Sequence, residues 1–109
     1  MAVPLLSEAL PEFASELEQF LRRDGEPALA DQVVGLRLVD RCRCGDDFCA
    51  MFYTAPKPSG PWRNLGEHTN VEVSAKTGIV VLDLVDSRIM AVEVLYRDDV
   101  RDALHEVLA

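Results

Sequence analysis

"IVVLDLVDSRIMAVEVLY", residues 79–96, is the stretch that decides the fold. It contains two apolar runs rich in β-branched residues, separated by the turn-forming pair Asp86-Ser87. Such a pattern predicts two antiparallel strands joined by a short turn. Both runs are apolar at successive positions, as expected of central strands whose sheet is covered by helices. These two strands are therefore the predicted centre of the domain.

Further strands are predicted on the amino-terminal side of this pair. Residues 35–44 alternate with a period of two, and residues 48–54 are rich in aromatic residues; the turn signal at 45–47 joins them into a hairpin. Residues 71–75 predict another strand. Residues 55–70 hold three prolines and two glycines without periodicity, so they predict a long loop of the kind that is often functional or mobile.

Helices are predicted at both ends of the chain. Residues 10–23 carry apolar side chains at intervals of three and four, with Pro11 in the first turn. Residues 26–33 predict a second, short helix. A final amphipathic helix begins at Asp98 or Asp99 and extends to residue 108. The order of helices and strands and the short turns predict one α+β domain over residues 1–109. Its sheet is predicted to be an antiparallel meander of about five strands, with the N-terminal and C-terminal helices packed on one face.

Composition and charge exclude several classes of protein. The 109 residues are 49% hydrophobic and 28% charged, which is the balance of a globular protein. The net charge of −8 disfavours binding to nucleic acids and to anionic membranes. No apolar run approaches the roughly 20 residues that span a bilayer. Three cysteines in one segment do not resemble a secreted disulfide framework, so a reducing cytoplasm is expected.

The three cysteines, Cys42, Cys44 and Cys49, lie within eight positions of the predicted hairpin. A two-residue turn at residues 46–47 places Cys44 opposite Cys49, and Cys42 opposite Met51. Opposed and alternate residues share a face, so all three thiols are predicted on one side of the hairpin, with Tyr53. We expect that side to point into the core, where cysteine behaves as a small apolar residue.

Two chemical alternatives remain open for the thiols. One is zinc held by the three thiolates, with His68 as the fourth ligand and Asp40 as a weaker candidate, although C-x-C followed by C-x4-C is not zinc-finger spacing. The other is redox chemistry, in which Cys44 and Cys49 close a disulfide.

Two groups of residues are candidates for protein interaction. Arg37, Arg41 and Arg43 alternate along one strand face and would receive carboxylates of a partner, or else pair with acidic groups nearby. Trp62 and Arg63 lie in the long loop. An exposed tryptophan is a natural interaction anchor, whereas a tryptophan folded back would cover the sheet edge.

No catalytic motif is present. The sequence has no nucleophile elbow, phosphate-binding loop, dinucleotide fingerprint or zinc-protease motif. Asp83 and Glu93 interrupt the central strands, but the predicted hairpin register places them opposite Met90 and Val80, on different faces. They are therefore not expected to act as an acid–base pair.

The stretches "GLRLVDRCRCGDDFC" (35–49) and "IMAVEVLYRDDV" (89–100) resemble a set of small bacterial proteins of unknown role. Those proteins have a C-x-C-G hairpin after a short helix and a closing strand of the type I-x-x-V/L-E-V. The resemblance implies a bacterial α+β domain and carries over no catalytic residues.

The leading expectation for function is a non-enzymatic binding or regulatory module without a resident cofactor. Its acidic surface would suit a basic protein partner, and the chain would be a monomer or a homodimer. The alternative is a zinc or redox protein that uses the three thiols.

Overall fold

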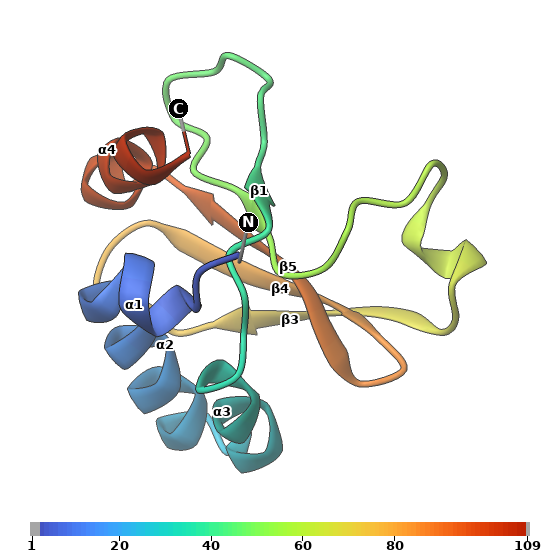
Figure 1. The fold of residues 1–109 in the computed structure, drawn as a ribbon. Coiled ribbons are helices and arrows are strands. Elements are labelled where there is room, and N and C mark those ends of the chain that lie inside the picture. The colour runs from blue at the N-terminus through green and yellow to red at the C-terminus, as the bar shows by residue number, and fades with distance from the viewer. Residues whose placement is uncertain (1–2, 109) are drawn as a thin grey trace.

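The computed structural model describes residues 3–108 and shows an α+β fold (Figure 1). In chain order the elements are α1 (Leu6–Ala9), α2 (Pro11–Arg23), α3 (Pro27–Val33), β1 (Asp40–Arg41), β2 (Phe52–Tyr53), the 3₁₀ turn η1 (Trp62–Asn64), β3 (His68–Val73), β4 (Ile79–Val85), β5 (Arg88–Leu95) and α4 (Asp98–Val107). The strands form one antiparallel sheet in the order β1-β2-β5-β4-β3. The predicted fold class is confirmed.

The sheet consists of two parts that the long loop connects. Strands β3, β4 and β5 follow one another as a meander, while the β1–β2 hairpin lies on the other side of β5. The loop is shorter than predicted, because β3 already begins at His68. Strands β1 and β2 are regular over only two residues each, although Cys42 N–H still donates to the carbonyl of Met51 at 2.8 Å.

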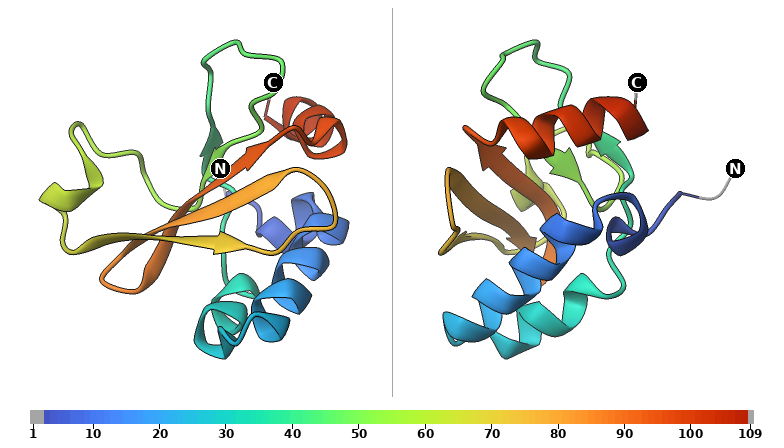
Figure 2. Two further views of the ribbon diagram at one scale, coloured as in Figure 1. Left: turned by 180° about the vertical axis from the view of Figure 1, so that it is seen from behind. Right: turned by 90° about the vertical axis from the view of Figure 1, so that its left-hand side faces the viewer.

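All four helices contribute to one core on one face of the sheet. In the view of Figure 2 the helical layer runs from α4 at the top, through α2, to α3 at the bottom. Phe13 of α2 meets Phe52 of β2 edge to face, with 6.0 Å between the ring centroids. Alternate residues of the central strands complete this core, among them Val80, Leu82, Val92 and Val94. Among residues 3–108, no α-helix packs against the other face of the sheet.

A bulge interrupts the central β4–β5 pair. Near the turn Leu84 lies opposite Ile89, but beyond the irregularity Asp83 lies opposite Ala91 and Glu93 opposite Val81. One extra residue on one strand inverts the alternation of faces. The predicted register is therefore wrong beyond the turn, and Asp83 and Glu93 share the uncovered face.

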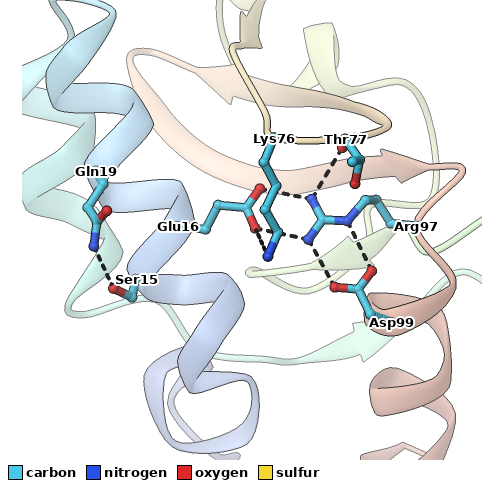
Figure 3. Close-up of polar contacts among 7 residues, drawn as sticks. All are labelled: Ser15, Glu16, Gln19, Lys76, Thr77, Arg97 and Asp99. Atoms are coloured by element: carbon cyan, nitrogen blue, oxygen red, sulfur yellow. Dashed lines mark hydrogen bonds and ion pairs between the residues drawn. The ribbon is translucent and has the colours of Figure 1, made fainter.

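A buried arginine connects the helices to the end of the sheet. The Arg97 side chain is 2% exposed and forms paired hydrogen bonds with both carboxylate oxygens of Glu16, at 2.8 and 2.9 Å. It binds Asp99 in the same way, at 3.0 Å for each contact, and also donates to the carbonyl of Thr77 at 3.3 Å (Figure 3). The Glu16 and Asp99 carboxylates raise the pKa of Arg97. This network holds α2, the β3–β4 turn and the start of α4 together.

Candidate metal centre

The three cysteine sulfurs form one cluster at the tip of the β1–β2 hairpin. Their Sγ atoms all lie within 4.8 Å of one another, and the three thiols are free. The hydrogen bond from Cys42 to Met51 confirms the predicted register at that pair. Gly45 adopts a positive φ of 84° in the connection, and Cys49 N–H donates to the carbonyl of Asp46 at 3.2 Å. The turn thus lies at residues 47–48 and not at residues 46–47 as predicted, and it still brings Cys49 next to Cys42 and Cys44.

The prediction that the thiols point into the core is wrong. Cys42 and Cys49 are half-buried and Cys44 is exposed. In the returning strand, Ala50 and Phe52 face the helices, so alternate positions such as Cys49 and Tyr53 face the other way. The large Phe52 side chain takes the inward direction because it packs against α2. The thiols consequently lie near the surface, where a solute can reach them.

The three thiols differ in acidity. Hydrogen bonding, first from the backbone N–H of Asp46 and then from the other two thiols, lowers the pKa of Cys44. Burial, as the main cause, raises the pKa of Cys49 to about 11. Cys44 is thus the first of these two to become a thiolate, which is the form that binds metals and attacks electrophiles.

The distances suit a soft cation after a small adjustment. With a zinc–sulfur bond of about 2.3 Å, tetrahedral coordination places sulfurs about 3.8 Å apart. The three sulfurs lie within 4.8 Å of one another, a limit about 1 Å longer than this spacing. Rotation of the cysteine side chains in a surface hairpin can remove that difference. Thiolates select zinc and other soft ions over magnesium or calcium.

His68 is not part of this centre, contrary to the prediction. It lies on β3, whereas the thiols follow β1, and these strands are at opposite edges of the sheet. Four inter-strand steps correspond to about 19 Å. The His68 Nε2 atom is instead 3.0 Å from Oδ1 of Asp83. Asp40 is closer to the cysteines, but its carboxylate accepts from Arg43 at 2.9 Å and from the Arg41 N–H at 2.8 Å.

The predicted arginine stripe is brought together only in part, since Arg41 and Arg43 line one hollow and Arg37 lies apart from it. Arg37 precedes β1 and donates to the carbonyl of Val3 at 2.9 Å. Arg41 is half-buried and binds the carbonyl of Leu108 beyond α4. Arg43 forms an ion pair with Asp40. The three side chains therefore have separate structural contacts, and whether any of them also binds a partner stays a prediction.

A hollow of about 350 Å³ lies directly beside the thiols. Its lining residues are Asp40, Arg41, Cys42, Arg43, Cys44, Tyr53 and Lys57. The Lys57 ammonium lies 5.9 Å from the centroid of the Tyr53 ring. Tyr53 and Lys57 were not recognised as site residues from the sequence, because Lys57 comes from the loop and no periodic pattern relates it to the hairpin.

Trp62 folds back onto the sheet through the same tyrosine. Its half-buried ring is tilted by 43° against Tyr53, with 6.4 Å between the centroids. Arg63 follows it in η1 and is exposed. The long loop projects from the rest of the molecule in Figure 1, but this contact anchors it to β2. Binding of a partner at Trp62 and Arg63 stays a prediction.

A second polar cluster occupies the uncovered face of the central strands. Asp83 is 4% exposed, and its Oδ1 atom accepts from Asn70 at 2.6 Å as well as contacting His68. Burial, followed by a hydrogen bond and charge repulsion from Asp83, raises the pKa of Glu93 to about 7. Glu93 is consequently partly protonated at neutral pH. The bulge that brings them together has no signal in the sequence.

Comparison with known proteins gives no significant match to a family model, a curated protein or a solved structure. The resemblance to small bacterial proteins therefore has no support from these comparisons; what stands is an α+β protein with a cluster of three cysteines. Within residues 3–108, no helix has the length and apolar character needed to cross a membrane.

Proposed function

We propose that the protein binds one zinc ion through Cys42, Cys44 and Cys49 and leaves one coordination position for an external ligand. The observation that carries the proposal is the convergence of three free thiols within 4.8 Å on an accessible face. Burial in the core would have favoured a purely structural role for the cysteines. Three protein ligands with an open fourth position are typical of reactive rather than structural zinc sites.

Metal analysis of the full chain tests the proposal. Protein purified in a phosphine reductant and incubated with zinc should retain about one ion per chain after gel filtration. Cys44→Ser should weaken zinc binding by more than about tenfold in a competition assay with a chromogenic chelator, since a thiolate ligand is lost. His68→Ala is the matched control and should bind zinc as the unmodified chain does. Absence of retained zinc, or equal weakening by both substitutions, would contradict the proposal.

A second candidate function is a binding module for a basic protein. It is favoured by a pair of stacked, exposed rings, Phe48 and Tyr96, which are 43% and 63% exposed with centroids 5.5 Å apart. They border a hollow of about 620 Å³ that is lined by Asp47, Asp98 and Asp99 and also by Arg97 and Arg101, so its formal charge is −1. Recovery of a partner from a lysate should fall with Phe48→Ser but not with Val34→Ser, a control at an exposed apolar residue elsewhere. Equal recovery with both variants would count against this surface.

A further inference from the structure

We propose that the fourth position at the metal is taken by a small anionic thiol from solution, whose sulfur binds the ion and whose carboxylates occupy the cationic hollow beside Cys42 and Cys44. This inference rests on the metal binding proposed above. It names the class of ligand that the open position accepts.

The chain itself supplies an incomplete donor set. Within residues 3–108, the group of metal-binding side chains that converges here consists of the three cysteines. Zinc is almost always four-coordinate with such ligands, so one donor has to come from elsewhere. His68 lies at the far edge of the sheet, and the Asp40 carboxylate is held by Arg43.

The hollow beside the thiols is suited to an organic ligand. Two of the three cysteines line it, so a molecule inside it can reach an ion held by them. Its volume of about 350 Å³ falls at the lower end of the range for small-molecule sites. Tyr53 supplies an apolar wall, over which the Lys57 ammonium lies.

The charges of the hollow select an anion. Arg41, Arg43 and Lys57 contribute three positive charges and Asp40 one negative charge, a local sum of +2 in a chain of net charge −8. Three thiolates and a divalent ion add −1, so the loaded site remains positive. A thiol that binds releases its proton to solvent, and its sulfur becomes the fourth ligand. Carboxylates on the same molecule then approach Lys57, as charge-assisted pairs do.

Cobalt(II) replaces zinc in the experiment because its absorption reports the number of thiolates. The loaded full chain, kept in a phosphine reductant, is titrated with mercaptosuccinate, with 2-mercaptoethanol and with succinate. Mercaptosuccinate should bind about tenfold more tightly than 2-mercaptoethanol, the gain expected of one or two exposed ion pairs. At saturation the sulfur-to-cobalt band should rise by about a third, as four thiolates replace three. Succinate should leave that band unchanged.

The two lysines of the chain provide a matched pair of variants. Lys57→Gln should reduce the preference for mercaptosuccinate to less than about threefold, since its charge lies in the hollow. Lys76→Gln, next to Glu16 and away from the hollow, should keep the full preference.

Each failure has a distinct meaning. If cobalt does not bind, both the metal centre and this inference are wrong. If cobalt binds but the two thiols bind equally, or Lys57→Gln has no effect, only the anionic ligand is wrong. A four-thiolate spectrum without added ligand, accompanied by a dimer in sedimentation, would overturn the inference in favour of a donor from a second copy of the chain.

Discussion

Replacing Glu16 by Gln should destabilise the fold far more than replacing Asp99 by Asn, although both carboxylates bind the same guanidinium. Each forms two hydrogen bonds to Arg97 at 2.8 to 3.0 Å. They differ in exposure: the Glu16 side chain is 10% exposed and that of Asp99 is 63% exposed. Water compensates for the loss of an exposed partner, whereas removal of the Glu16 charge leaves the buried guanidinium with the exposed Asp99 carboxylate as its remaining charged partner.

The magnitudes follow from this difference in burial. Loss of one partner of a buried pair costs about 3–5 kcal/mol, and Gln keeps one acceptor, so Glu16→Gln should cost about 2–3 kcal/mol. Asp99→Asn should cost at most about 1 kcal/mol, the range of an exposed ion pair. For 109 residues the entropy of unfolding is about 230 cal/mol/K, so 1 kcal/mol corresponds to about 4 °C in Tm. The expected decreases in Tm are thus about 9–13 °C for Glu16→Gln and at most about 4 °C for Asp99→Asn.

Thermal and urea unfolding followed by circular dichroism measure both changes. Glu12→Gln, an exposed residue of the same helix α2, serves as the control and should shift the free energy of unfolding by less than about 0.5 kcal/mol. Equal Tm decreases for Glu16→Gln and Asp99→Asn would refute the reasoning from burial. So would a loss below about 1 kcal/mol for Glu16→Gln.

Three further predictions concern other parts of the molecule. The pKa of Glu93 in the folded chain, about 7, exceeds its ordinary value of 4.5, so the stabilising contribution of the protonated Glu93 is complete below pH 4.5 and is lost as the pH rises through 7. Glu93→Gln should flatten this decline in the free energy of unfolding. An unchanged slope of stability against pH would contradict the prediction. Ser87 has a φ of 67° in the β4–β5 turn, so Ser87→Gly should relieve backbone strain and raise the free energy of unfolding in urea by about 0.5–1 kcal/mol. A decrease in that free energy would contradict the prediction. In metal-free protein, iodoacetamide should label Cys44 before Cys49, because the pKa of Cys44 is lowered and that of Cys49 is raised. Bound zinc should slow both reactions. Peptide mapping that finds Cys49 labelled first would contradict the prediction.

The central strands and the main helices could be predicted because local patterns specify them. The apolar runs of residues 79–96 became β4 and β5, and Pro11 begins α2 as its conformational preference suggests. The position of the hairpin beside β5 was not predictable in this way. It depends on which edge of the central meander remains open, and that is a property of the assembled sheet.

The candidate site was predicted in part. The grouping of the three thiols on one side of the hairpin was predicted from the two-residue alternation of a strand, although the turn lies at residues 47–48 and not at the predicted residues 46–47. That His68 lies outside the site and Lys57 lies beside it could not be predicted in this way, because the strand order places His68 and the loop places Lys57. Asp83 and Glu93 meet because of one extra residue in a ladder, which alternation cannot reveal.

The sequence by itself determined the α+β class, the helical and strand segments, and the close spacing of Cys42, Cys44 and Cys49, since these depend on short-range periodicity and turn chemistry. Only the tertiary structure decided that the thiols face away from the core. Alternation defines two faces of a strand but does not say which is buried; here Phe52, packed against Phe13 of α2, takes the inner face and leaves the outer one to the cysteines.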